Sequence, residues 1–398
     1  MTHSGIRCAV LLFCSILPAA AQETASISGN LSDPSGAAVG QAAVTLTNSE
    51  SGASRKMPSD TSGHYDFGQL PAGSYELQAE KTGFKTAIRR GIRIAVNQAA
   101  VVNVPLQLGS VLAQVVVTEN APIAAPTIGQ TSGLVEGRQV RDLPLNGRSY
   151  DELLTLNPGI VNYSSEKNNT TPGVSNSAVG NMFAVSGRRP QENLFLLNGV
   201  EYTGSAEIDM TPGGTSGLLL GVDAIREFNV LTGFYGAEYG NRPGAQVLIV
   251  DRSGSNEVHG SAYEFFRNSR FDARNFFDRK SVPEVQRNQF GGSLGGALTP
   301  NRTFLFGDYE GLRQNLGLSD VTLVPDNNAR LGILPTGTVQ VSPAAARLLA
   351  LWPGQSPGTP FDKNGIAEAF STPKQAIRED FGTTRLDKVF SDWDTLSG

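Results

Sequence analysis

The stretch "SAYEFFRNSRFDARNFFDRK", from Ser261 to Lys280, packs six aromatic and five basic side chains into twenty positions. Together with the residues before it, "EVHGSAYEFFRN", it alternates in steps of two, which is the period of a β-strand. The two faces would carry Ser261, Tyr263 and Phe265 on one side and Ala262, Glu264 and Phe266 on the other. Three interpretations are open: a clamp for single-stranded nucleic acid, an ordinary amphipathic element, or a strand at a membrane interface, where aromatic rings gather.

The composition argues against nucleic acid. The chain has 32 Lys and Arg against 37 Asp and Glu, a net charge of −5 and a pI near 5.4. Nucleic-acid binders normally carry a basic excess, because their affinity comes from neutralising phosphates. With 45 glycines and 17% charged residues, the 398-residue chain is expected to be mainly β, rich in turns and divided into two or three domains.

Residues 1–21 have the pattern of a secretory signal peptide. Arg7 gives a basic start, Cys8 to Leu17 is an apolar run, and Ala19 to Ala21 form a small-residue cleavage site. The apolar run is too short to span a bilayer, which takes about 20 residues. Both cysteines of the chain lie in this segment, so the exported protein is expected to be held together without disulfides.

Residues 22–108 predict an antiparallel β-sandwich. Short alternating runs recur roughly every ten residues between turn sequences such as Asp33-Pro34-Ser35-Gly36. The alternation places Val44, Leu46, Tyr75 and Leu77 in the core.

Residues 109–125 read as a linker that contains one β-prone run, Val115-Val116-Val117-Thr118. Two interpretations of this run stay open. An extended segment without a partner in its own chain can add to the sheet edge of another protein, but the run is equally suited to be the last strand of the sandwich.

Residues 126–251 predict an α/β domain. "EGRQVRDLP" reads as a short helix stopped by Pro144, and "SYDELLTLNPG" as a helix with Ser149 at the N-cap and Glu152 completing a capping box. "MFAVSGRRPQENLFLLNGVEY" reads as two strands, with Asn198-Gly199 as a turn. A short helix, a strand, a glycine-rich connection and a final strand from Ala245 to Val250 follow.

These phrases together resemble the TonB-dependent outer-membrane receptors of the Oar-like group, which carry an N-terminal carboxypeptidase-regulatory-like domain. "LPAGSYEL" is similar to that first domain, and "RDLPLNGRSYDELLTLNPGI" and "FAVSGRRPQENLFLLNGVEYT" are similar to the plug domain of the group. "RNQFGGSLGGAL" and "RTFLFGDYEGLR" look like barrel strands. Two departures concern the plug: Asn198 stands where the group usually has Asp, and Leu248 to Asp251 replaces a run that usually contains Asn and Thr.

The resemblance implies a fold class that is mainly β: an N-terminal β-sandwich, an α/β plug domain (126–251), and the first strands of an incomplete outer-membrane β-barrel (252–398). It implies a receptor or transporter in the outer membrane of a Gram-negative cell, in contact with membrane lipid, with the sandwich in the periplasm and plug-gated uptake or export of an unidentified ligand. A TonB-type energy-coupling protein would bind the TonB box, best matched by Val115, Val116, Val117 and Thr118. No cofactor is implied, and the ligand of the sandwich, if it has one, would be a carbohydrate or another large molecule.

Within this resemblance the opening stretch becomes the first barrel strand and its outer loop. Arg267 and Arg274 are the candidate ligand contacts of this loop. Because Asp272 and Asp278 stand close to them in the sequence, local ion pairing is the alternative role.

The sequence gives little support to an enzymatic function. Gly291 to Gly295 matches the Gly-x-Ser-x-Gly nucleophile elbow around Ser293, but no helix signal follows, and His64 and His259 both precede it. We therefore expect a glycine-rich barrel strand. The two histidines lie far apart and have no cysteine beside them, so no metal site is predicted.

Residues 252–398 hold about four predicted strands: Val258–Arg267, Phe290–Leu298, Thr303–Arg313 and one near Phe381–Phe390, with a short helix Pro343–Leu351 between the last two. A barrel around a plug needs ~22 strands of ~10 residues, so we expect a truncated barrel that cannot transport by itself. The alternative function is a secreted carbohydrate-binding or adhesive sandwich protein, which would be extracted without detergent.

Overall fold

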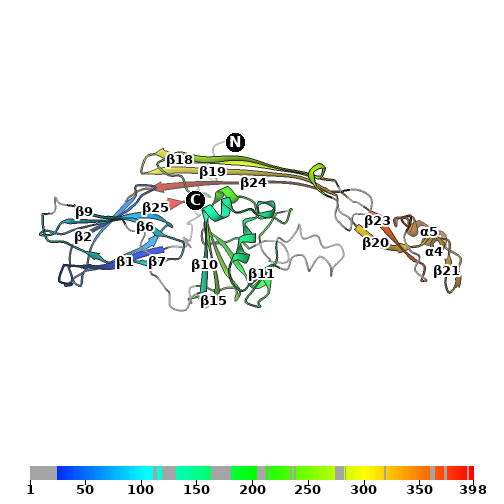
Figure 1. Cartoon of the computed structure of the whole chain (residues 1–398), viewed down its shortest axis with the longest axis horizontal. Helices are drawn as coiled ribbons and strands as arrows, with labels where there is room; N and C mark the ends of the chain where they lie inside the picture. The colour runs from blue at the N-terminus through cyan, green and yellow to red at the C-terminus, as the bar shows by residue number, and fades with distance from the viewer. Residues whose placement is uncertain are drawn as a thin grey trace, which may run out of the picture. The chain divides into compact units, whose positions relative to one another are not determined.

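The computed structural model describes residues 25–110, 114–118, 131–162, 181–203, 212–214, 216–233, 235–236, 239–273, 282, 284–317, 320–358, 364–371, 374–391 and 394–398. The predicted signal peptide lies outside these residues. The chain forms two compact units, one of residues 1–262, 292–309 and 381–398 and the other of residues 263–291 and 310–380. The described elements are mostly strands (Figure 1).

The first part of the chain is a sandwich of two sheets. One sheet has the order β4-β1-β7, with β8 also paired to β1: β4 (His64–Leu70), β1 (Ala25–Ser32), β7 (Ala99–Val101) and β8 (Val104–Pro105). The other has the order β3-β2-β5-β6-β9: β3 (Ser54–Pro58), β2 (Ala43–Asn48), β5 (Gly73–Glu80), β6 (Thr86–Ile94) and β9 (Gln114–Thr118).

The sandwich core follows the alternation of the sequence. Val44, Leu46, Tyr75 and Leu77 are all buried, as predicted. They pack in one cluster with side chains of the opposite sheet, such as Ile27. Burying one face of each sheet in this way supplies the main stabilisation of a sandwich.

The second part is built on a five-stranded sheet of order β10-β15-β16-β13-β14 (Figure 1). Its strands are β10 (Thr131–Glu136), β15 (Ile225–Gly233), β16 (Gln246–Asp251), β13 (Leu194–Leu197) and β14 (Val200–Glu201). The helices are α2 (Gly137–Asp142), η1 (Asn146–Arg148), η2 (Tyr150–Leu156), η4 (Pro190–Glu192) and η5 (Val222–Ala224). A separate pair joins β11 (Ile160–Asn162) to β12 (Phe183–Val185).

Most of the predicted elements of this domain are present, including the Asn198-Gly199 turn, in which both residues have positive φ angles of 50° and 80°. The expected capping box at Ser149 is wrong. The segment Tyr150–Leu156 is a 3₁₀ helix without a side-chain cap, because the Ser149 hydroxyl instead donates to Asp151. Nearby, α2 carries the box, in which Gln139 and Glu136 bond reciprocally.

The last part contains five strands that lie side by side in the order β17-β18-β19-β24-β25, of which β18, β19 and β24 are long (Figure 1). They are β17 (His259–Asn268), followed by the short η6 (Ser269–Phe271), then β18 (Val285–Thr299), β19 (Thr303–Gly317), β24 (Lys374–Val389) and β25 (Thr395–Ser397). The four predicted strands are present, and β18, β19 and β24 are longer than predicted. At 15 to 16 residues each, these three measure roughly 50 Å.

A small folded insertion connects β19 to β24. It contains β20 (Asp320–Pro325) paired with β23 (Ile366–Ser371), the hairpin β21 (Ile333–Leu334) and β22 (Gly337–Thr338), and the helices α4 (Asn327–Arg330) and α5 (Pro343–Leu349). Helix α5 is two residues shorter than predicted. Its start follows a standard N-terminal pattern, since Ser342 accepts a bond from the Ala345 amide and Pro343 follows the cap.

Candidate functional site

The segment Val115 to Thr118 lies in β9, at the edge of the second sandwich sheet. β9 runs parallel to β6, with Val116 opposite Ile88 and Val117 opposite Arg89. Of the two interpretations left open by the sequence, this structure has the run as a sandwich strand. Among the described strands β9 is the terminal one, so its other edge pairs with none of them. Val116 remains 46% exposed.

The second part of the chain, built on the five-stranded sheet, contains a buried carboxylate. Asp151 is 2% exposed and accepts hydrogen bonds from the Ser149 hydroxyl and, at 3.0 Å, from the Asn181 side-chain amide. Burial raises the pKa of the Asp151 carboxyl to about 6, although the two hydrogen bonds oppose this shift. The Asp151 carboxyl is therefore expected to titrate near pH 6.

This carboxyl predicts a pH dependence of stability. Because the folded state holds the Asp151 proton more tightly than the unfolded chain, stability falls as pH rises from the ordinary pKa of 3.8 to about 6. Asp151→Asn stays neutral, so it should match the wild type near pH 4 and exceed it by about 2–3 kcal/mol near pH 7.5. Urea unfolding followed by circular dichroism at both pH values measures the difference. An equal difference between the two proteins at both pH values would contradict the prediction.

A buried ion-pair network joins the end of β16, in the five-stranded sheet of the second part, to the long strand β24. The Arg385 guanidinium on β24 bonds the carboxylate of Asp251, the last residue of β16, and lies 3.0 Å from Asp387. Ser253 donates a further bond of 2.5 Å to Asp387. Arg385 is 16% exposed, so its two carboxylate partners provide its main electrostatic compensation. This network was missed in the sequence, because Asp251 and Arg385 stand 134 residues apart.

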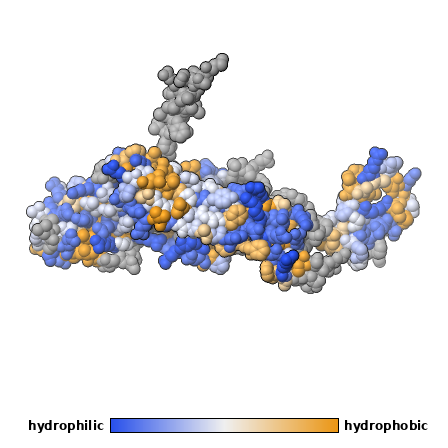
Figure 2. All heavy atoms as spheres, turned by 90° about the horizontal axis from the view of Figure 1, so that it is seen from above, coloured by the Kyte–Doolittle hydropathy of each residue, from blue (hydrophilic) through white to orange (hydrophobic). Residues whose placement is uncertain are grey.

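The long-stranded sheet has two different faces. On one face Ser261 and Ser293 share a hydrogen bond of 2.8 Å, and Gln289 bonds Glu310. The opposite face exposes apolar side chains of β18, β19 and β24 and of the residue directly before β17: Val258, Leu294, Leu298, Leu305, Tyr309 and Leu386. Figure 2, which views the molecule from above, shows apolar atoms gathered in this region.

The apolar part of this face has a definite length. On β18 it runs from Phe290 to Leu298, which is close to the about 9–11 residues with which a tilted strand crosses an outer membrane. Beyond Phe290 the side chains become polar. The Arg313 guanidinium lies 5.6 Å from the centre of the Phe290 ring, a cation–π contact at the boundary.

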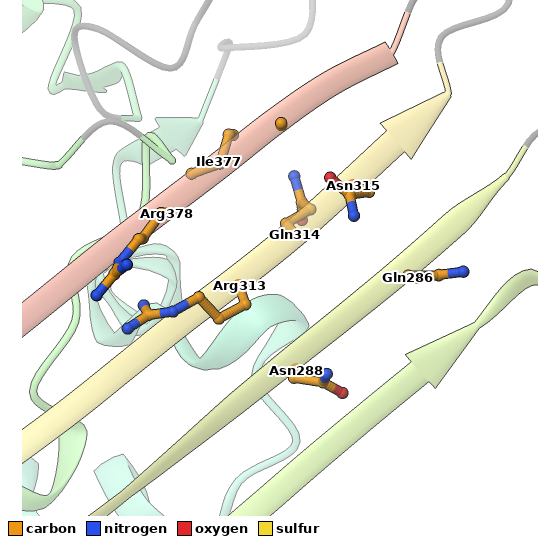
Figure 3. Close-up of a pocket in the computed structure, with 8 residues that line it drawn as sticks. Gln286, Asn288, Arg313, Gln314, Asn315, Ile377 and Arg378 are labelled. Carbon is orange, nitrogen blue, oxygen red and sulfur yellow. The ribbon is translucent and has the colours of Figure 1, made fainter.

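The polar end of these strands holds a small cavity of about 310 Å³ (Figure 3). Amide and guanidinium groups dominate its lining of Gln286, Asn288, Arg313, Gln314, Asn315, Ala376, Ile377 and Arg378. Asp380 accepts from Arg313 at 2.6 Å and from Arg378 at 3.3 Å, which holds both cations on β19 and β24. The cavity can offer hydrogen bonds to hydroxyl or carboxylate groups.

Of the two candidate ligand contacts, Arg267 pairs with Asp272, with 3.1 Å between guanidinium and carboxylate, and stays 60% exposed. Arg274 lies outside the described residues. The structure therefore does not bring the two arginines together into a described site.

The features that suggested enzyme chemistry have structural roles. Ser293 lies in the middle of β18, as predicted, and its hydroxyl bonds that of Ser261. Among the described residues no group of three or more His, Cys, Asp or Glu side chains is placed to hold a metal ion. In the same part of the chain none of the helices is long and apolar enough to cross a membrane.

Comparison with known proteins agrees with this arrangement. Residues 250–398 match the outer membrane beta barrel domain, and residues 26–107 match the carboxypeptidase regulatory-like domain. The chain is thus an outer-membrane protein of the Gram-negative type that carries a carboxypeptidase regulatory-like domain ahead of outer-membrane β-barrel sequence. It is a homologue of the TonB-dependent transporter Oar of Myxococcus xanthus, with 27% identity over 286 residues.

The Oar alignment covers 67% of this chain and 24% of the relative, so the chain spans about a quarter of the length of that protein. The outer membrane transporter YddB from Escherichia coli is 14% identical, with a TM-score of 0.41 over 67% of this chain and 32% of that chain. A putative carbohydrate binding protein from Bacteroides uniformis is 19% identical, with a TM-score of 0.19 over 21% of this chain and 40% of that chain.

Proposed function

We propose that the chain serves in a TonB-dependent outer-membrane receptor or transporter, in which residues 126–251 are a plug that gates the passage of a ligand. The observation that carries this proposal is the buried network of Asp251, Arg385 and Asp387. It links the end of the α/β domain to a strand of the long sheet. A plug that stays inside a barrel needs a link of this kind.

In this proposal membrane lipid covers the exposed apolar face of the long strands. The face matches the hydrocarbon layer of an outer membrane in length, and the change to polar side chains beyond Phe290 marks one boundary. The short connection between β18 and β19, residues 300–302, would lie on the periplasmic side together with the sandwich. The folded insertion between β19 and β24 would lie outside the cell. On that side Arg267 and the polar cavity are candidates for ligand contact.

The energy for plug movement would come from a TonB-type protein that pairs with β9. A run of β-branched residues, with an edge that pairs with none of the described strands, can add a strand through backbone hydrogen bonds. No cofactor takes part in this mechanism.

The test of the coupling segment is Val116→Pro. Proline removes a backbone donor and fixes φ in the middle of β9, so capture of the full chain by an immobilised periplasmic domain of a TonB-type protein should weaken by about tenfold or more. Val116→Thr, which keeps the amide and the β-branch, serves as the control and should bind as the wild type does. Capture of the proline variant at wild-type strength would move the coupling segment away from β9.

A further inference from the structure

An apolar side chain of the sandwich, Val96, packs against the plug-like domain. Val96 follows β6 by two residues and is fully buried. It packs with buried side chains of the plug-like sheet, Leu231 on β15 and Leu248 on β16. Half-buried neighbours complete this socket: Leu196, Tyr235, Tyr239 and Val250. A valine that leaves its own domain to fill an apolar socket contributes roughly 1.5–3 kcal/mol by burial.

Polar side chains of β15 satisfy the backbone of the same valine. The Val96 amide donates to the Glu227 carboxylate at 2.6 Å, and the Asn229 side-chain amide donates to the Val96 carbonyl at 3.4 Å. Glu227 is 3% exposed. A buried carboxylate is costly unless a donor meets it, so the position of Glu227 depends on the seated sandwich.

An ion pair at the rim adds a third link to the same strand. Both terminal nitrogens of Arg226 lie 2.9 Å from the carboxylate oxygens of Glu50, a bidentate pair between β15 and the sandwich. Four residues of β15, at positions 226, 227, 229 and 231, therefore contact the sandwich rather than only their own domain.

β6 connects the partner-binding edge on β9 with Val96, which packs against β15 and β16. β6 pairs along five residues with β9, and its chain enters the socket two residues beyond its end. Adding a strand to the open edge of β9 would keep this pairing intact. Displacing β9 would first break the five-residue ladder with β6.

We propose that the sandwich is the bridge between the energy-coupling protein and the plug: an extended strand of that protein adds to the open edge of β9 while Val96 stays seated on β15. This inference rests on the proposed function and goes beyond it, because it makes the sandwich part of the docking site. Force applied to β9 is then transmitted to the plug sheet through the β6 pairing and through the packing of Val96 against β15 and β16.

The first test locks β9 to β6 with a disulfide. The chain has no cysteine beyond residue 14, so Arg89→Cys with Val117→Cys, a directly opposed pair, forms one defined bridge. The oxidised protein should be captured by an immobilised TonB-type periplasmic domain within about twofold of the reduced protein. Thr45→Cys with Lys56→Cys, an opposed pair at the far edge of the same sheet, controls for oxidation.

The second test removes the apolar contact between Val96 and the plug-like sheet. Val96→Asp should raise hydrogen exchange in β15 by about tenfold while partner capture stays unchanged. Val101→Asp, at a position that is 52% exposed, is the matched control and should leave exchange unchanged. In the wild type, the bound TonB-type domain should leave residues 95–97 and β15 as protected as before.

The possible outcomes distinguish a failure of the proposed function from a failure of the bridging role of the sandwich. Failure of the wild-type chain to bind the TonB-type domain would overturn the proposed function. Wild-type binding that is lost when the disulfide between positions 89 and 117 forms would overturn the bridging role of the sandwich alone, because the partner would then displace β9. That role is equally wrong if partner binding exposes β15, or if Val96→Asp leaves its exchange unaltered.

Discussion

Replacing Arg385 by methionine is expected to lower the free energy of unfolding by about 3–5 kcal/mol, because it leaves two buried carboxylates without a cation. The guanidinium bonds both Asp251 and Asp387, and all three side chains are mostly buried. Urea unfolding of the full chain in detergent measures the change. Hydrogen exchange in β16 and β24 should rise with it, since the network joins these two strands.

Two controls separate charge from packing. Arg378→Met on the same strand removes a cation that is 75% exposed and paired to Asp380, so it should cost no more than about 0.5 kcal/mol. Adding Asp251→Asn and Asp387→Asn to Arg385→Met should recover most of the lost stability, since no charge then remains unpaired. A loss below about 1 kcal/mol for Arg385→Met alone would show that the carboxylates are not held by this cation.

Gly29→Ala is expected to destabilise the sandwich strongly. A Cβ atom on Gly29, in the middle of β1, would lie 2.0 Å from the carbonyl oxygen of Val102 and 2.6 Å from its carbon. These are backbone atoms, and the same oxygen accepts a bond from the Tyr65 hydroxyl. Relief therefore requires β1 to move, at the upper end of the about 1–3 kcal/mol that overpacking costs, or above it.

Gly68→Ala is the matched control for this substitution. Gly68 lies in β4 of the same sheet, and a Cβ atom there would meet nothing within 4 Å. Exchange of the β1 and β4 amides, followed by mass spectrometry, should rise in the Gly29 variant and stay unchanged in the Gly68 variant. Equal behaviour of the two variants would mean that the close approach at Gly29 does not limit stability.

The sequence was sufficient wherever short-range patterns decide the structure. A period of two residues identified the strands of the sandwich and the inward positions of Val44 and Leu77. It also separated the faces of β17, because neighbouring side chains on a strand must point to opposite sides. The Asn198-Gly199 turn was predictable for a similar reason, since few residues accept positive φ. The resemblance to TonB-dependent receptors rested on ordered phrases of this kind.

Only the tertiary structure could decide which distant residues meet. Val115 to Thr118 read equally well as a free segment or a sandwich strand, because β propensity does not specify a pairing partner. The pattern around Ser149 predicted a capping box, but burial of Asp151 beside it redirected the hydroxyl. Nothing in the local sequence of Val96, Glu227 or Arg385 marks them, since their contacts join residues more than a hundred positions apart. Local preference determines which elements form, and the packing of those elements determines which charges and apolar side chains must be matched.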